Sequence, residues 1–468
     1  MIRLLVCLLL SVTSCFAANP PNILFILADD LGWSDTGCYG HAYHETPHLD
    51  SLAKQGMRFT QAYAPAPICS ASRVAFLTGK TPARLHFEFV TKDKPGSQKL
   101  GQPLQAPPYP TNLPLEEITT AEVLADVGYH PAYFGKWHVN LHYRGYLGWS
   151  PTHGPMQQGF AEGDADFGGH PYAYFKGGDR SDLDLREGEF PPDSLTDKVI
   201  AFLQRPHEKP FFVQWSHYYV HDPVHTRCRW LFEKYRSKLP AEVSDERVAY
   251  AAMVSTLDHE IGRALEVLEA TGLAKNTMIV FTSDNGGHPN YTGNSPLRGS
   301  KWNLYEGGIR VPFIVRWPEH VADNTKCDQP VHGCDLLPTF AEIAGAKIGK
   351  VDGVSIAPLL KDASHIMPER AMIWHLPYYH PEKGFDRAPA KIGVNDYVTS
   401  QTRPHSAIRV GHHKLLHFYE DDRDELYDLE VDPGEATDLA AQQPEIARSL
   451  RDRLAEELRN SNARFAQP

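Results

Sequence analysis

The sequence predicts an α/β protein with a large, mostly parallel sheet flanked by helices and a smaller α+β domain at the C-terminal end. Two observations lead to this prediction. Continuous apolar runs such as Asn22–Ala28 are typical of strands buried on both faces of a parallel sheet, and they alternate with helical patterns over residues 20–366. From about Met367 the pattern changes to short strand candidates, and one amphipathic helix ends the chain.

Length and composition support a folded, two-part chain. The 468 residues are about three times the length of a typical domain. Hydrophobic residues make up 42% and charged residues 22%, which excludes a disordered or fibrous protein. With 46 Lys and Arg against 58 Asp and Glu, the formal charge of −12 argues against a nucleic-acid-binding protein, which would need clustered basic residues.

The large domain is predicted to span residues 20–366. Its further strand candidates lie at 132–134, 211–215, 278–282 and 311–315. Thr119 and Glu122 form a capping box that starts a helix before Gly128, and a longer helix covers about 245–270. Residues 140–195 are rich in Gly, Pro, His and aromatics and are expected to form an ordered loop over a crevice.

The smaller domain is predicted to span residues 367–468. Strand candidates lie at 371–374, 407–410 and 414–418. The terminal helix carries an apolar face of Ile446, Leu450, Leu454 and Leu458.

Residues 1–18 have the pattern of an export signal. Arg3 precedes an apolar core at 4–10, and the small residues Ala17 and Ala18 follow. This run is too short to cross a bilayer, and no later segment is apolar enough to do so. We therefore expect a periplasmic or secreted protein. Residues 12–15 (VTSC) also match a bacterial lipoprotein cleavage box, so a lipid anchor through Cys15 stays open.

The cysteines give a second indication. Removal of the signal leaves Cys38, Cys69, Cys228, Cys327 and Cys334, an odd number, so at least one has no intramolecular partner. Cys327 with Cys334 and Cys38 with Cys228 are candidate disulfides. No Cys/His zinc spacing is present.

Polar, reactive side chains directly follow most of the predicted strands. In an open parallel sheet, ligands bind beyond the carboxyl ends of the strands, so we expect these residues to converge in one crevice. The residues are Asp29, Asp30, Lys136, His138, His217, His221, Asp284 and Asn285.

Cys69 is predicted to start a helix. Pro65 and Pro67 disfavour helix before it, and the helix-compatible segment after it ends at Gly79. At this position the helix dipole would stabilise negative charge and activate a nucleophile. A buried structural cysteine is an equally good interpretation of this segment alone.

Two kinds of charged group accompany the cysteine. Asp29, Asp30, Asp284 and Asn285 offer oxygen ligands that suit Ca²⁺ or Mg²⁺ better than zinc, although either pair alone could merely cap a turn. Cationic and proton-transferring side chains could surround an anion. These are Arg73, Lys136, His138, His221 and Lys301.

Taken together, these segments resemble the formylglycine-dependent sulfatases of the alkaline phosphatase superfamily. The resemblance rests on a C-x-[P/A]-x-R signature at 69–73 with Leu-Thr-Gly at 77–79, followed in the family's order by other motifs from about residue 21 to 440. These are GKWH at 135–138, SDNGG at 283–287, PLRGSK at 296–301, YEGGIRVP at 305–312, ELYDL at 425–429 and DPGE at 432–435. Ala71, Ser300 and the Val139-Asn140 pair depart from the commoner residues, and none of these changes removes a catalytic side chain.

The resemblance implies an alkaline phosphatase-like fold and a modified residue. A separate formylglycine-generating enzyme would oxidise Cys69 to formylglycine, whose hydrated aldehyde attacks sulfur. Ca²⁺, or Mg²⁺, would be held by Asp29, Asp30, Asp284, Asn285 and residue 69. Arg73, Lys136 and Lys301 would stabilise charge, His221 would protonate the leaving alcohol, and His138 would take a proton from the diol to release sulfate.

The leading hypothesis is therefore an exported sulfatase acting on a sulfated sugar or polysaccharide. The aromatic- and His-rich loop suggests sugar contacts. The candidates are His170, Tyr172, His288, Arg298 and His375. The alternatives are a formylglycine-dependent phosphonate or phosphodiester hydrolase of the same superfamily and a non-catalytic glycan-binding relative.

Overall fold

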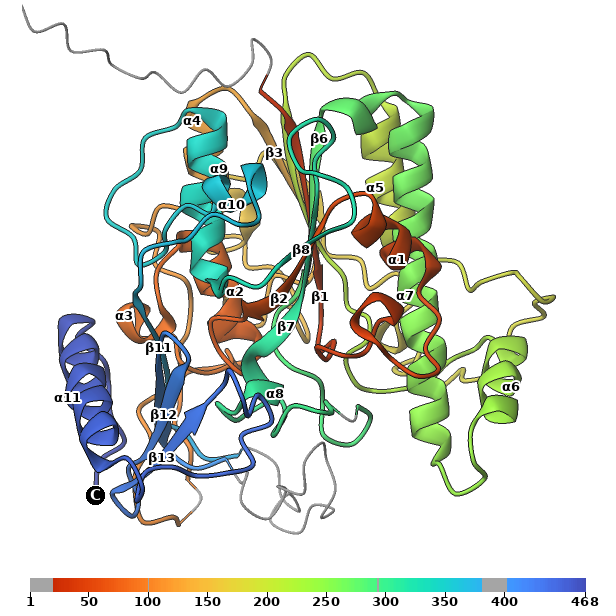
Figure 1. Ribbon diagram of the computed structural model, residues 1–468. Helices are drawn as coiled ribbons and strands as arrows, with labels where there is room; N and C mark the ends of the chain where they lie inside the picture. The colour runs from red at the N-terminus through yellow and green to blue at the C-terminus, as the bar shows by residue number, and fades with distance from the viewer. Residues whose placement is uncertain (1–19, 100, 293, 381–401) are drawn as a thin grey trace, which may run out of the picture.

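The protein forms a central sheet between two layers of helices, with a second, smaller sheet beside it (Figure 1). The computed structural model describes residues 20–99, 101–292, 294–380 and 402–468. The predicted export signal, with its Cys15, lies outside the described residues. Helices α1, α5 and α7 cover one face of the central sheet, and α2, α4, α9 and α10 cover the other, while α6 packs on the outside against α7 (Figure 1).

The central sheet is mixed and mostly parallel, as predicted. Its order is β4-β3-β5-β1-β6-β7-β2-β8, and β9 pairs with β2 beyond the path. The strands are β1 (Asn22–Ala28), β2 (Met57–Tyr63), β3 (His130–Gly135), β4 (Glu162–Asp164), β5 (Phe211–Ser216), β6 (Thr277–Ser283), β7 (Arg310–Arg316), β8 (Thr325–Cys327) and β9 (Val331–His332). Strand β7 runs antiparallel to both β6 and β2, although its apolar sequence resembles that of the parallel strands.

The helices follow the predicted patterns where those were strong. They are α1 (Pro47–Lys54), α2 (Cys69–Thr78), α3 (Pro82–Leu85), α4 (Thr120–Asp126), α5 (Ser194–Gln204), α6 (Arg229–Lys238), α7 (Asp245–Ala270), α8 (Glu306–Ile309), α9 (Leu336–Ala344), α10 (Ala357–Lys361) and α11 (Pro444–Asn460). Thr119 and Glu122 form the expected capping box of α4. Gly79 ends α2 with a left-handed backbone (φ 66°), which glycine adopts without strain.

Strand β1 shows why the central sheet is buried on both faces. Alternate side chains of a strand point to opposite faces. Ile23, Phe25 and Leu27 pack in one hydrophobic cluster with α2, α4 and α9, whereas Leu24 and Ile26 pack in another with α1, α5 and α7. Because both faces of β1 are covered by helices, consecutive side chains of the strand must be apolar.

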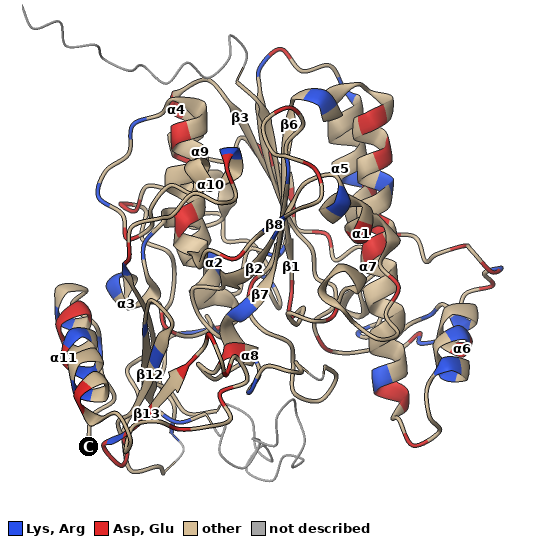
Figure 2. Cartoon of the chain, in the orientation of Figure 1, with Lys and Arg blue, Asp and Glu red and all other residues tan. Residues whose placement is uncertain are grey.

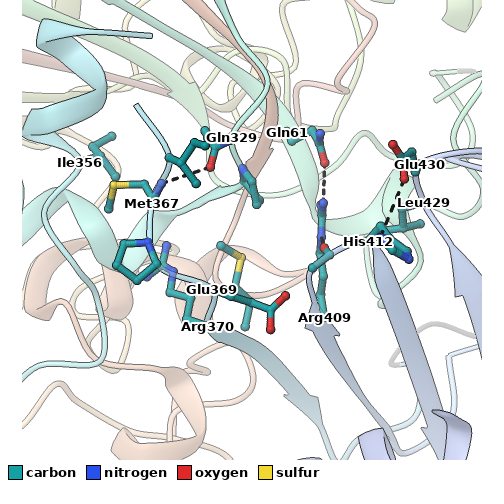
Figure 3. Close-up of a pocket in the computed structure, with 15 residues that line it drawn as sticks. Gln61, Gln329, Ile356, Met367, Glu369, Arg370, Arg409, His412, Leu429 and Glu430 are labelled. Carbon is teal, nitrogen blue, oxygen red and sulfur yellow. Dashed lines mark hydrogen bonds and ion pairs between the residues drawn. The ribbon is translucent and has the colours of Figure 1, made fainter. Parts of the chain in front are cut away.

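The second sheet is antiparallel and consists of β10 (Ala371–Leu376), β11 (His405–Val410), β12 (His413–Phe418) and β13 (Arg423–Asp428). Leu450, Leu454 and Leu458 of α11 pack against it, and the charged residues of α11 lie on its outer face (Figure 2). Polar contacts join the two sheets. Arg409 on β11 donates a hydrogen bond to Gln61 on β2 at 2.6 Å, beside a cavity of about 420 Å³ (Figure 3).

Both predicted disulfides are wrong. Among the described residues, Cys38, Cys69, Cys228, Cys327 and Cys334 are free thiols. Cys38 Sγ contacts Thr36 Oγ1, and Cys228 Sγ contacts the carbonyl of Glu189, so these two sulfurs lie in different environments. Within the described part of the chain, no helix combines the length and apolar character that a bilayer crossing requires.

Candidate active site

Side chains at the ends of four strands and the first residue of α2 converge at one place. Cys69 Sγ lies 3.5 Å from Asp29 Oδ1 and 3.8 Å from Asp30 Oδ1, both beyond the end of β1. Asp284 and Asn285 follow β6, and Asn285 donates a hydrogen bond to Asp30 Oδ1 at 2.7 Å. Residues distant in the sequence thus form one cluster, as the strand-end argument predicts.

Two salt bridges neutralise the carboxylates that follow β1. Lys136 Nζ lies 2.5 Å from Asp29 Oδ2, and Lys301 Nζ lies 2.6 Å from Asp30 Oδ2. Burial alone would raise the pKa of Asp29, but Lys136, with smaller contributions from His221 and Arg73, brings this pKa well below its ordinary value. Asp29 is therefore ionised. Both lysines bind Oδ2, which leaves the Oδ1 atoms on the side of Cys69.

Arg73 fixes the geometry around α2. Its guanidinium, fully buried, donates two hydrogen bonds to Asp284 Oδ2 at 3.0 and 2.7 Å and a third to the carbonyl of Lys136 at 2.6 Å. Ser70 Oγ donates a hydrogen bond to the carbonyl of His138 at 2.6 Å. The first turn of α2 is thereby tied to the segment that follows β3.

The thiol of Cys69 is neutral in this setting. Burial raises the pKa of Cys69 well above its ordinary value, and Lys136 and Lys301 only partly oppose this effect. The helix N-terminus therefore does not produce a thiolate in the unmodified chain. A reactive nucleophile at position 69 would therefore require a chemical modification of the cysteine side chain.

The two predicted histidines, His138 and His221, are both buried but have different neighbours. His221 Nε2 is 3.1 Å from Lys301 Nζ and 3.5 Å from Asp30 Oδ2. Burial, reinforced by Lys136, lowers the pKa of His138 well below its ordinary value, so this imidazole is neutral. His138 (φ 56°) and Asp30 (φ 61°) both have left-handed backbones, which are rare for residues other than glycine and concentrate at functional sites.

The donor set fits a hard divalent cation. Three carboxyl groups, Asp29, Asp30 and Asp284, are fully buried together, and burial with the neighbouring Asp29 raises the pKa of Asp284 to about 6. The amide oxygen of Asn285 is buried without a hydrogen-bond partner among the described residues. An unsatisfied amide oxygen among carboxylates is the environment that Ca²⁺ or Mg²⁺ relieves. Cys69 and His221 complete the group of close ligand atoms around Asp29 and Asp30.

The candidate sugar contacts divide into two groups. Tyr172 Oη lies 2.9 Å from His221 Nδ1, and His288 packs edge-to-face against Trp302, next to Lys301, with ring centroids 5.0 Å apart. These two remain predicted substrate contacts. His170 is fully buried, with one ring nitrogen on the carbonyl of His221 and the other on the amide of Tyr172, so it orients the loop instead of facing a substrate.

The structure does not support two other predicted contacts. His375 Nδ1 and Nε2 contact Ser406 Oγ and the carbonyl of Arg464, so both nitrogens are used at the second sheet. The Arg298 guanidinium stacks on Tyr305 and donates to Tyr427 Oη at 2.8 Å. The sequence shows that a cation or an imidazole is present, but it does not show that other residues of the same chain already bind it.

Family comparison settles the class of this site. A model of the sulfatase family matches residues 21–346, which is more than half of the chain. The chain belongs to the sulfatase family. A second model, described as N-sulphoglucosamine sulphohydrolase, C-terminal, matches residues 300–463. Curated arylsulfatases and steryl-sulfatases are among its relatives, and the protein is accordingly a sulfate ester hydrolase.

Relatives cover nearly all of the sulfatase chain. It is 33% identical to a sulfatase of Formosa agariphila, with 96% of this chain and 90% of that protein covered. It is 30% identical to arylsulfatase A of Homo sapiens over 93% of this chain and 87% of that protein. The crystal structure of Ps i-CgsB in complex with k-i-k-neocarrahexaose has a TM-score of 0.72 and 26% identity, covering 94% of this chain and 93% of that one.

Three features of this sulfatase escaped sequence analysis. The carbonyl of Asp222 lies 2.6 Å from His221 Nδ1, and Tyr146 Oη lies 3.4 Å from Tyr172 Oη. The contact of Asp222 with His221 could have been suspected, because the two residues are neighbours in the sequence. The third feature is Lys414, a fully buried cation between Glu306 and Glu435 that joins β12 to the segment carrying Lys301.

Proposed function

We propose that this sulfatase is exported and removes sulfate from a sulfated sugar or polysaccharide, using formylglycine derived from Cys69 and a bound Ca²⁺ or Mg²⁺. The observation that carries the proposal is the placement of Cys69 at the start of α2 against Asp29 and Asp30, with Lys136 and Lys301 on their far oxygens. Such a site has acidic ligands for a cation and two buried ammonium groups for an anion.

Sugars are favoured over other sulfate esters on two grounds. Tyr172 of the 140–195 loop contacts His221, and Tyr146 of the same loop packs against Tyr172, so the two tyrosines offer aromatic faces for a sugar ring. Among the similar proteins are an N-acetylgalactosamine-6-sulfatase of Mus musculus, 31% identical, and the carbohydrate complex of Ps i-CgsB.

When present, the cation would neutralise sulfate oxygens and formylglycine would supply the oxygen that reacts with sulfur. The side chains of the chain itself do the rest. Lys136 and Lys301 orient the sulfate group and offset its growing charge, while Arg73 holds Asp284 and the 136 carbonyl in place. The Lys301–His221 pair gives a proton to the departing alcohol oxygen, and neutral His138 accepts a proton through its ring nitrogen.

The decisive experiment measures free sulfate released from a panel of sulfated mono- and oligosaccharides by protein co-expressed with a formylglycine-generating enzyme. Cys69→Ala is the blank, and mass spectrometry checks residue 69. We expect release from at least one sugar above the blank. Phosphonate and phosphodiester substrates are assayed in parallel, because a phosphonate monoester hydrolase of Agrobacterium radiobacter shares the fold (TM-score 0.66, 20% identity). Faster turnover of those esters, or activity of Cys69→Ala equal to the parent, contradicts the proposal.

A further inference from the structure

A second imidazole lies beside His138. The ring centroids of His138 and His142 are 5.5 Å apart, with the rings tilted by 46°. His142 Nδ1 lies 2.9 Å from Asp93 Oδ1. The Asp93 side chain is 85% exposed, whereas that of His142 is only 6% exposed. Asp93, His142 and His138 therefore lead, in that order, from solvent to the site.

Hydrogen-bond valence fixes the protonation of His142. A carboxylate only accepts, so the proton of neutral His142 sits on Nδ1 and Nε2 has a lone pair. Burial lowers the pKa of His142, although Asp93 opposes the shift, so the ring is neutral at physiological pH. Its Nε2 is buried and has no hydrogen-bond partner among the described residues. Such an unsatisfied atom costs on the order of 1–3 kcal/mol unless a donor reaches it.

His138 has the complementary unsatisfied atom. Its Nδ1 is also buried without a partner in the described part of the chain. A proton on His138 Nδ1 would satisfy both rings through a small side-chain rotation or one bridging water. The opposite tautomer would set two lone pairs against each other. Only the first arrangement leaves the lone pair of His138 on Nε2.

We propose that Asp93 and His142 hold His138 in the tautomer with Nδ1 protonated and carry its proton to solvent. When His138 Nε2 accepts a proton, its Nδ1 proton passes to His142 Nε2, and the Nδ1 proton of His142 passes to Asp93 or to water at the surface. One proton enters at Nε2 and one leaves at Asp93, so both rings are neutral with their protons on Nε2. The transfers run back along the same path when His138 gives up its Nε2 proton, which restores the starting tautomers. Asp93 and His142 are positioning residues, and the step rests on the proposed role of His138.

The tautomer can be measured without any turnover. The full chain, expressed without the maturation enzyme, is labelled with ¹⁵N-histidine, and long-range ¹H–¹⁵N spectra identify the protonated nitrogen of each ring. The signal missing in His138→Gln assigns His138. We expect Nδ1 to be protonated in the parent and Nε2 in His142→Ala. A proton on Nε2 in the parent, or the same tautomer in both proteins, overturns the proposal even if sulfatase activity is found.

Kinetics test the relay itself. On a sugar sulfate that the parent turns over, we expect His142→Ala to lower kcat about tenfold to hundredfold with KM changed less than about twofold. Added imidazole should restore part of kcat by filling the vacated space. The matched control is His130→Ala, since His130 pairs with Glu162 at 2.5 Å at the opposite end of β3.

The outcomes are separable. An unchanged kcat, or a loss that imidazole does not restore, overturns the relay. If His142→Ala does not fold, the exposed change Asp93→Asn decides, because the relay predicts a several-fold loss of kcat and unchanged kcat rejects it. Absence of parent activity on every substrate would contradict the proposed function, while the tautomer measurement would still stand.

Discussion

Lys301 Nζ lies 3.1 Å from His221 Nε2. An ammonium group has no lone pair, so Lys301 donates in this contact and His221 Nε2 accepts, which places the ring's proton on Nδ1. That nitrogen lies 2.6 Å from the carbonyl of Asp222, which can only accept. His221 and Lys301 thus form a hydrogen-bonded unit in which the ammonium donates and the imidazole accepts.

This unit should matter most when the leaving group is poor. We expect His221→Gln to lower kcat about 100-fold for an alkyl sugar sulfate but less than about tenfold for 4-nitrophenyl sulfate, whose phenolate departs without a proton. Rates of sulfate and nitrophenol release measure the two losses. His225→Gln is the control, because His225 contacts Tyr174 further along the same loop. Equal losses for both substrates would show that His221 does not supply the proton.

The local sequence pattern was enough to predict those elements in which hydrophobic pattern and helix start and end signals all favour the same structure. Strand β1 is apolar from Ile23 to Ala28 because both its faces are buried. Helix α2 begins after Pro67 and ends at Gly79, so its first residue could be predicted. The polar residues after each strand then had to meet, because parallel strands end at one edge. The class of the site came instead from the ordered motifs that resemble the sulfatase family.

Other features depend on distances that sequence does not contain. Cys327 and Cys334 are close in the chain, yet their thiols are free. Strand β2 (Met57–Tyr63) was missed because it carries polar residues where it meets the second sheet. A lysine is normally expected at the surface, but Lys414 is fully buried. Its charge is compensated by two carboxylates from other segments of the chain, Glu306 and Glu435.

The carboxylate cluster should bind a cation. We expect saturating Ca²⁺ to raise the melting temperature by about 2–5 °C, since a ligand at about 100 times its Kd contributes about 2.7 kcal/mol. Asn285→Ala removes the unpaired amide oxygen and should abolish most of this rise. Differential scanning fluorimetry with and without EDTA measures it, and the exposed change Asp362→Asn is the control. A full Ca²⁺ shift in Asn285→Ala would rule out this oxygen as a ligand.

Two tyrosines of one loop should differ in their effect on substrate binding. Tyr143 and Tyr146 are both 38% exposed. Only Tyr146 packs toward the site, with its ring centroid 5.3 Å from that of Tyr172. We expect Tyr146→Ala to raise KM for a sulfated oligosaccharide about 3- to 10-fold through loss of aromatic contact, and Tyr143→Ala to change it less than about twofold. Steady-state sulfate release measures both, and matching effects would place the sugar elsewhere.

The buried ion network behind the Lys301 segment should be required for stability. Lys414 Nζ lies 2.9 Å from Glu306 Oε1 and 2.8 Å from Glu435 Oε1, and all three side chains are fully buried. Lys414→Met leaves two buried carboxylates without their shared cation, so the free energy of unfolding should fall by about 3–5 kcal/mol.

A second substitution distinguishes lost charge balance from lost packing. Adding Glu435→Gln to Lys414→Met removes one of the uncompensated charges, so the double variant should unfold at higher denaturant concentration than Lys414→Met alone. Lys326→Met is the surface control, because its ion pair with Asp328 is exposed and should be worth less than about 1 kcal/mol. If the double variant is no more stable than the single one, the cation acts through packing and not through its charge.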